Sequence, residues 1–401
     1  MWSRVRVDIA WGNLIGGFVG ALLSDDVVAA QEGLEAGWSA GQGDALAALS
    51  VRSGFDLLLQ ALPLSPGDEV LMSAVTIPAM PAIAAAHGLV PVPVDVAGSD
   101  FCIDLEALRQ AISPRSRVLV VAHLFGARPE MAEVCSLARE HGLFVVEDCA
   151  QAWCGSVWRG SPEADASLFS FGTIKTATAA GGALCRVRDA ELLARMRSIQ
   201  SRQPLQPRRA FLLKLLKCGA LKGLSARPLY GLLAAWARRT GRRIDDVLGP
   251  LARGFPGPVR LEPLRRRPCA GLLRLMARRL ETYDPRRIEA RIETARRYVE
   301  WLGLQETQPE LLATPHSFWL FPLVDDRPED RVAEFAKRGI DAAQRGRLEV
   351  IPAPPGRSEL KCPSAKDLLQ RTVLLPCYGG VPVPSSGRRS ELARDGVTAG
   401  W

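Results

Sequence analysis

The sequence predicts an α/β protein with a mostly parallel central sheet and a smaller α+β unit near its C-terminus. In the first half of the chain, short apolar runs alternate with helical patterns, and glycine or proline marks most junctions. After residue 188 the texture changes to arginine-rich helical segments, followed by a few separate strands. The 401 residues are enough for two domains.

The strand candidates of the first half are short and strongly apolar. They cover residues 70–72, 90–94, 118–121, 143–146 and 168–171, and helical patterns cover 78–87, 105–112 and 130–141. Strand, helix and strand at this spacing favour right-handed crossovers, which give a parallel sheet covered on both faces. Such sheets bind ligands beyond the carboxyl ends of their strands, so polar residues at those ends are the candidates for function.

The composition divides the chain into three parts. We predict a major domain over 1–200, a basic helical connecting segment over 201–268, and a smaller α+β domain over 269–401. The last part begins with a helical region over 269–304, broken near Pro285, and continues with the strand SFWLFPLV, a helix over 328–338 and the late strand TVLLPCY. The tail from residue 381 lacks a final amphipathic helix.

The net charge of +8 is unevenly spread. Residues 201–300 hold 24 Lys and Arg against 8 Asp and Glu, which is +16 and leaves −8 for the rest. A basic segment can attract phosphate, nucleic acid or an anionic membrane, but solvated helix faces are the simpler interpretation, and we expect no nucleic-acid partner. FLLKLLKCGALKGL could lie on a membrane surface, although packing on the sheet domain is the commoner outcome.

The cysteines and the N-terminus indicate the compartment. Nine scattered cysteines without a CxxC pair suggest neither a metal site nor a disulfide framework, so we expect a reduced, cytoplasmic protein. Residues 9–23 follow Arg4 and Arg6 as in a signal peptide. However, Asp8 interrupts the basic region, no small-residue cleavage site follows, and the stretch is short and glycine-rich for a membrane span.

Two acids stand at the end of one predicted strand. Val145-Val146 runs into Glu147-Asp148, where parallel sheets place active sites. Taken alone, Asp148 is most simply a helix N-cap, since aspartate is common there. A catalytic role needs a second group nearby.

Lys175 supplies that group, in the loop after the next strand. A lysine that forms a Schiff base must reach a carbonyl carbon, lose its proton readily and have little bulk around it. The surrounding sequence, SFGTIKTATAAGGAL, is rich in small residues. We interpret their size as room for a ligand beside the amine.

A third element opens the helical pattern after residue 50. Arg52-Ser53-Gly54-Phe55 places a glycine near a helix start, where backbone N–H groups can approach a phosphate. A carboxylate, a lysine and a phosphate cradle together match the needs of pyridoxal phosphate: a partner for its ring nitrogen, an amine for its aldehyde and donors for its phosphate.

Four stretches of the chain then carry a family resemblance. PGDEVLMSAVTIPAM, RVLVVAHLFGARPEM, HGLFVVEDCAQAWCGS and ADASLFSFGTIKTATAAGGALCRVRD together resemble the DegT-type (DegT/DnrJ/StrS) aminotransferases, from about Gly41 to Asp189. The resemblance implies a fold-type-I, aspartate-aminotransferase-like fold that binds pyridoxal phosphate in its major domain. It also implies a homodimer with active sites at the subunit interface.

The resemblance also implies roles for individual residues. Lys175 would bind the cofactor covalently and Asp148 would pair with its ring nitrogen. The other implied contacts are Gln151 beside the ring, Ile77 over its face, and Ser170, Gly54 and Phe55 on the phosphate. His123 matches a family position near the cofactor, and a structural hydrogen bond at a strand end is an equally good interpretation.

The sequence departs from the family at several of these positions. Phe55 stands where the family has threonine, so only backbone amides would serve there. Ile77 stands where the family has an aromatic ring, so stacking is lost. LRRRP, with Arg265 to Arg267, replaces the family's Asn-Tyr-Arg motif that reaches the partner subunit's cofactor phosphate, and an arginine could take over that contact.

The resemblance implies an aminotransferase that moves an amino group from glutamate or glutamine to a keto sugar, cyclitol or related carbonyl. Two alternatives stay open. One is another reaction on the same cofactor, such as dehydration, decarboxylation or C–C bond formation. The other is a degenerate, non-enzymatic binding protein that acts through residues 201–268.

Overall fold

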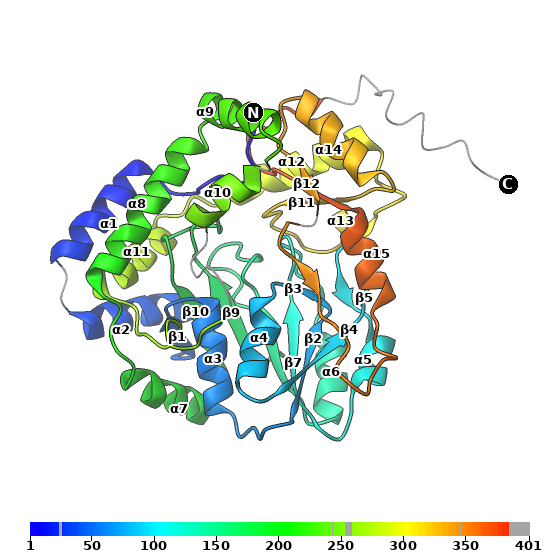
Figure 1. Ribbon diagram of the computed structural model, residues 1–401. Coiled ribbons are helices and arrows are strands. Elements are labelled where there is room, and N and C mark those ends of the chain that lie inside the picture. The colour runs from blue at the N-terminus through cyan, green and yellow to red at the C-terminus, as the bar shows by residue number, and fades with distance from the viewer. Residues whose placement is uncertain (24–25, 243, 253–258, 345, 385–401) are drawn as a thin grey trace.

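A seven-stranded sheet forms the centre of the protein in the computed structural model, which describes residues 1–23, 26–242, 244–252, 259–344 and 346–384 (Figure 1). Its strands lie in the spatial order β1 (Ala45–Ala48), β10 (Ala183–Val187), β9 (Ala166–Ser170), β8 (Phe144–Asp148), β7 (Ser116–Ala122), β2 (Glu69–Ser73) and β4 (Val90–Val94). The five strands from β9 to β4 are parallel, and β10 is antiparallel to both of its neighbours. The predicted mostly parallel sheet is therefore confirmed.

Helices cover both faces of this sheet (Figure 1). Those of the first half are α2 (Val27–Ser39), α3 (Val51–Ala61), α4 (Ala79–Ala86), α5 (Leu105–Ala111), α6 (Ala132–Glu140) and α7 (Ala190–Ser201). Short strand pairs join β3 (Val75–Thr76) to β13 (Glu349–Val350) and β5 (Val96–Ala97) to β6 (Cys102–Ile103). Each strand and helix predicted in this half is present with slightly shifted ends, because apolar periodicity locates an element better than its limits.

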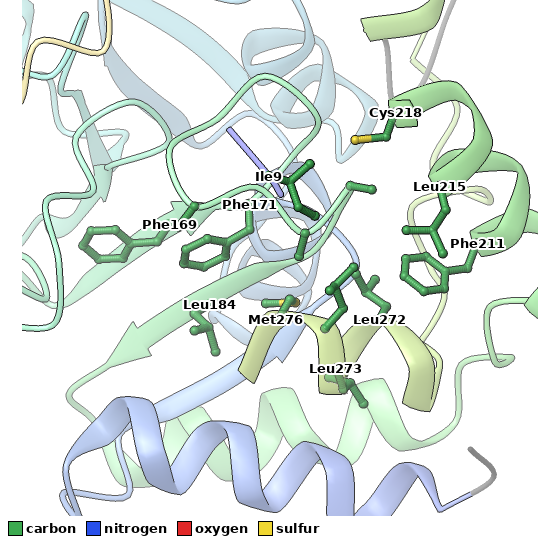
Figure 2. Packing of buried hydrophobic residues seen from close by; sticks show 14 of the residues in the cluster. Ile9, Phe169, Phe171, Leu184, Phe211, Leu215, Cys218, Leu272, Leu273 and Met276 are labelled. Carbon is green, nitrogen blue, oxygen red and sulfur yellow. The ribbon is translucent and has the colours of Figure 1, made fainter. Parts of the chain in front are cut away.

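The arginine-rich part and the region after it fold into helices. They are α8 (Arg208–Leu224), α9 (Arg227–Arg239), α10 (Ile244–Ala252), α11 (Ala270–Glu281) and α12 (Arg286–Leu302). The break predicted near Pro285 separates α11 from α12. Helix α8 turns Phe211, Leu215 and Cys218 inward, against α11 and the loop after β9 (Figure 2). The expectation that this segment packs on the sheet domain is confirmed.

The N-terminal apolar stretch forms α1 (Trp11–Leu23). It buries Leu14, Gly17 and Ala21, and Gly17 faces Leu215 of α8 and Leu275 of α11. Among the residues that the structure describes, no helix is long and apolar enough to cross a bilayer.

The C-terminal part carries a small antiparallel sheet. Its elements are α13 (Glu310–Ala313), β11 (Phe321–Val324), α14 (Pro328–Lys337), β12 (Ala343–Gln344), α15 (Pro363–Arg371) and β14 (Thr372–Leu375), and the strands lie in the order β11-β14-β12. The strand predicted for SFWLFPLV is too long. Ser317 instead donates its N–H to the carbonyl of Gly126 at 2.9 Å, which ties this segment to the loop after β7. Of the predicted tail, residues 385–401 lie outside the described residues.

Candidate active site

Asp148 and Lys175 lie together at the carboxyl edge of the parallel sheet. Asp148 is the last residue of β8, and Lys175 belongs to the loop that follows the neighbouring parallel strand β9. The two charges are close enough that each changes the pKa of the other. The structure therefore brings together the two residues to which the sequence assigned the chemistry.

Asp148 is a buried carboxylate with few hydrogen-bond donors around it among the described residues. Its Oδ1 accepts a hydrogen bond from the Ala150 N–H at 3.0 Å. Burial raises its pKa, and Ala150, Lys175 and His123 offset this only in part. The alternative of a helix N-cap is wrong, because residues 149–165 form turns and no helix starts there. The carboxylate is left facing the site, where a protonated nitrogen of a ligand would stabilise its charge.

Lys175 carries an amine that loses its proton easily. Burial lowers its pKa from 10.5 to about 8; Asp148 opposes this shift and Arg52 adds to it. The Nζ atom lies 4.2 Å from the centroid of the Trp319 ring. A lysine with a pKa this close to neutrality has a substantial neutral fraction, which is the form that attacks a carbonyl carbon.

Three side chains from other elements hold the lysine loop in place. Arg279 of α11 donates to the Thr178 carbonyl at 3.1 Å, and Arg291 of α12 donates to Thr176 Oγ1 at 2.7 Å. The third donor is the indole of Trp319, which bonds the Ile174 carbonyl at 2.8 Å. The sequence reading missed these donors, because they lie far along the chain and share no motif with the loop.

The alanines after Lys175 pack into the core. Ala177, Ala179 and Ala180 are buried and belong to the core cluster that also contains Phe171, Leu272 and Met276. Ala177 and Ala180 have φ angles of 53° and 61°, a left-handed conformation that large or branched side chains tolerate poorly. The small size of these alanines therefore serves the tight turn and its packing, and room for a ligand beside the amine stays a prediction.

The predicted phosphate amides, those of Gly54 and Phe55, lie inside helix α3. Helix α3 begins at Val51, so Gly54 lies in its second turn and donates its N–H to the Ser50 carbonyl at 2.9 Å. A Cβ at Gly54 would lie 2.5 Å from the Cys185 sulfur, so this glycine allows α3 to approach β10. Phe55 is fully buried in the core. The first-turn amides of Val51 and Arg52 lie at the helix N-terminus. Phosphate contacts of Gly54 and Phe55 stay predictions.

Two cations missed by the sequence reading gather at this helix N-terminus. Arg52, in the first turn of α3, is close enough to lower the pKa of both Lys175 and Lys214. Lys214 of α8 has its Nζ 3.7 Å from the position that a Cβ on Gly181 would occupy, and burial lowers its pKa to about 8. This concentration of positive charge, with the Ser170 hydroxyl at the end of β9, suits a phosphate.

The remaining predicted ring contacts lie around the same edge. Gln151 Oε1 accepts the Phe125 N–H at 2.8 Å, which fixes the side chain beside the loop after β7. Ile77 follows β3 and packs between two parts of the core. Their contacts with a cofactor ring stay predictions.

His123 has the structural role that the sequence left as an alternative. Its Nε2 is 2.8 Å from Oε1 of Glu147, and both side chains are buried. Ser167 and the Ser161 N–H donate to the other Glu147 oxygen at 2.6 and 2.9 Å. The Cys149 sulfur and potential metal-binding atoms of His123 and Glu147 lie within 4.8 Å of one another, but the Glu147 carboxylate oxygens are already hydrogen-bonded. The cluster is a polar network beneath the sheet edge.

Arg265 of the LRRRP stretch pairs within its own chain. Its Nη2 and Nε are each 3.1 Å from an oxygen of Asp56, a buried residue of α3 that also bonds His87 at 2.8 Å. Arg265 therefore makes an ion pair within its own chain. Contacts of Arg266 and Arg267 with a partner stay predictions.

A basic cavity of about 210 Å³ adjoins the lysine loop. It shares Trp319 and Ile174 with that loop, and charged residues line its other side: Arg4, Arg6, Arg286, Arg287 and Arg291 with Asp8 and Asp284. Asp8 pairs with Arg287 and Arg291, whereas Arg6 lies over the Tyr378 ring at 4.4 Å. The excess of cations gives the cavity a positive potential.

Comparisons with known proteins converge on one family. Residues 36–211 match the model of the DegT/DnrJ/EryC1/StrS aminotransferase family. The chain is 36% identical over 156 residues to the UDP-N-acetyl-3-dehydro-α-D-glucosamine 3-aminotransferase of Acidithiobacillus ferrooxidans, covering 37% of this chain and 42% of that protein. It is 32% identical over 170 residues to the GDP-perosamine synthase of Caulobacter vibrioides, covering 42% of this chain and 45% of that protein. The match thus spans less than half of each relative.

Solved structures match over almost the whole chain. Helicobacter pylori PseC, an aminotransferase involved in pseudoaminic acid biosynthesis, superposes with a TM-score of 0.68 at 18% identity, covering 98% of this chain and 96% of that one. The PLP-form of the putative sugar aminotransferase Spr1654 from Streptococcus pneumoniae gives 0.63 at 17% identity, covering 94% of both chains. The fold is that of these aminotransferases, including the part beyond residue 211.

Proposed function

We propose that this chain, whose residues 36–211 match the model of the DegT/DnrJ/EryC1/StrS aminotransferase family, is a pyridoxal-phosphate-dependent aminotransferase. The amino group would pass from an amino acid, glutamate or glutamine, to the keto group of a sugar, a cyclitol or a related carbonyl compound. The observation that carries the proposal is the placement of Asp148 and Lys175 at the ends of neighbouring parallel strands, each changing the pKa of the other.

The residues present fit the three parts of this cofactor. Asp148 offers a carboxylate for the ring nitrogen, and Lys175 offers an amine for the aldehyde. Ser170, Arg52 and Lys214, together with the first-turn amides of α3, offer donors for the phosphate. When bound, the cofactor supplies an acceptor for the electron pair left on the substrate carbon.

The chain's own residues would then bind, orient and move protons. Asp148 would hold the proton on the ring nitrogen, since its negative charge favours the cationic form. The Lys175 amine would remove a proton from the carbon of the amino donor in the first half of the reaction. It would deliver a proton to the carbon of the acceptor in the second half, because its pKa of about 8 allows both the neutral and the charged form near neutrality. The donors Arg279, Arg291 and Trp319 would keep the amine in position by fixing its loop.

The basic cavity supports an anionic acceptor. It adjoins the lysine loop at Trp319 and Ile174, and its arginines outnumber its acids. A phosphorylated or nucleotide-linked keto sugar would place its negative groups there, since guanidinium groups bind phosphate well. Arg286, which is exposed at the rim, would contribute to acceptor binding without touching the lysine loop.

A homodimer is part of the proposal, on the basis of the family resemblance. The subunit interface would lie at the active site, with Arg266 or Arg267 as the residue offered to the partner's cofactor phosphate. Mass measurement in solution tests this, and a monomer with full activity would contradict it.

Borohydride trapping tests the central assignment. The cofactor-loaded protein should become irreversibly labelled at Lys175, and Lys175→Ala should abolish labelling while an exposed control, Lys217→Ala, leaves it intact. Incubation with glutamate or glutamine should convert the bound cofactor to its amine form, seen as a change in absorbance. Labelling without any such conversion, for any amino acid, would favour another reaction on the same cofactor. A lack of labelling would favour a binding protein.

A further inference from the structure

One outer face of the molecule is apolar and basic at the same time. Helix α1 exposes Trp11, Ile15, Val19 and Leu22, which lie on one side of the helix because they follow its periodicity. Helix α8 exposes Leu213 and Leu216 in the same manner. The two helices pack side by side along one edge of the molecule (Figure 1). We call these six residues, with Arg209 and Lys217 of α8, the α1–α8 face.

Several apolar side chains on both helices are more than half exposed. Ile15 and Leu216 are 62% and 56% exposed. Trp11 bridges the helices, because its ring lies 3.7 Å from the position of a Cβ on Gly219 and 5.6 Å from Lys222 Nζ. Soluble proteins seldom expose clustered large apolar side chains, so such a face calls for an occupant.

The charges around the face point to the kind of occupant. Helix α8 carries three exposed cations, Arg208, Arg209 and Lys217, and no Asp or Glu, and α1 contains no charged residue. A second copy of the chain, docked by a two-fold axis, would bring these cations together and repel itself. Nucleic acid would satisfy the cations but leave leucine and isoleucine without a partner. An anionic lipid surface satisfies both, since the apolar side chains enter the acyl boundary and Lys and Arg meet the headgroups.

We propose that the α1–α8 face docks the protein on the surface of an anionic lipid bilayer. The helices would lie in the plane of the membrane, with Ile15, Val19 and Leu216 inserted and Arg209 and Lys217 at headgroup level. Trp11, at the start of α1, is suited to the interface between water and lipid, where indole rings collect. The proposal does not depend on the proposed reaction, because it uses none of the residues assigned to it.

Vesicle flotation of the full-length protein tests the proposal. We expect binding to vesicles of phosphatidylcholine with phosphatidylglycerol, weak binding to phosphatidylcholine alone, and a loss of binding as salt is raised. The double variant Ile15→Ser/Leu216→Ser should bind at least about tenfold more weakly, because two inserted apolar side chains are lost. Val157→Ser is the matched control, since Val157 is 90% exposed on a loop elsewhere.

The charge is tested separately. Lys217→Gln should lower the affinity for the anionic vesicles about fivefold, whereas Arg109→Gln, an exposed charge on α5, should leave it unchanged. Circular dichroism and borohydride trapping would verify that each variant is folded. Binding that is absent, or equal on both vesicle types, would overturn the proposal. A double variant that turns an oligomer into a monomer without lipid would also overturn it, and would identify the face as a subunit interface.

Discussion

Glu147 and Asp148 are neighbours on β8, but their side chains point to opposite faces of the sheet and have different surroundings. Glu147 points to the network of His123, Ser167 and Ser161, and these hydrogen bonds hold its pKa below the ordinary value despite burial. Asp148 points to the site, has one backbone donor, and has its pKa raised by burial. Side chains alternate between the two faces along a strand. Two adjacent residues can therefore be a structural acid with several hydrogen-bond donors and an acid whose charge a bound ligand would stabilise.

The largest test of this contrast is Asp148→Asn. The substitution keeps the shape and removes the charge that would hold the ring-nitrogen proton. We expect turnover to fall about a thousandfold or more, as when other preorganised electrostatic groups are removed, with cofactor still bound. Steady-state kinetics and the cofactor absorbance measure both effects. Near-normal turnover would mean that another residue pairs with the ring nitrogen.

Glu147→Gln should have the opposite profile. It weakens the hydrogen bonds to His123 and Ser167 and leaves buried polar atoms poorly matched, so unfolding free energy should fall by about 2–4 kcal/mol. Turnover of the molecules that remain folded should change only a few fold. Urea unfolding, with activity scaled to the folded fraction, separates the two variants. A large loss of turnover with unchanged stability would place Glu147 in the chemistry and break the contrast.

Asp56 extends the contrast to a third buried acid. It resembles Glu147, because His87 and Arg265 lower its pKa against burial. Arg265→Ala should cost about 1–3 kcal/mol of stability, since His87 remains as a partner. Cofactor affinity should stay unchanged, measured by fluorescence titration. A tenfold weaker cofactor affinity at unchanged stability would restore the predicted phosphate contact for Arg265.

The smallest expected effect is a difference in pH dependence. The native pKa of Glu147 lies below 4.5, so between the two values the unfolded chain binds more protons and stability rises with pH. For Asp148 the native pKa lies above 3.8, so the native state binds more protons and stability falls as pH rises through that window. We therefore expect the melting temperature of the cofactor-free protein to rise less steeply with pH in Glu147→Gln than in the unchanged protein. In Asp148→Asn the slope should change in the opposite direction. The same direction in both would contradict the assigned environments.

The sequence was informative where local pattern and position coincide. Alternating apolar runs located the sheet, and strand ends pointed to Asp148 and Lys175. It was less informative about contacts between distant segments: Arg279, Arg291 and Trp319 reach the lysine loop from three separate elements, and Lys214 reaches its other side from α8. The sequence also did not indicate the packing role of Gly54, because the close approach of α3 to Cys185 joins segments that are far apart in the chain.

The hydrogen bonds to the lysine loop determine which segments of the chain must be inherited or expressed together. Residues 36–211 include Asp148, Ser170 and Lys175, yet Arg279, Arg291 and Trp319, which donate hydrogen bonds to the lysine loop, lie after them. A gene fragment that encodes only the recognisable segment would therefore keep the reactive groups and lose their alignment. We expect recombination between relatives to succeed only when this segment and α11, α12 and Trp319 are exchanged together.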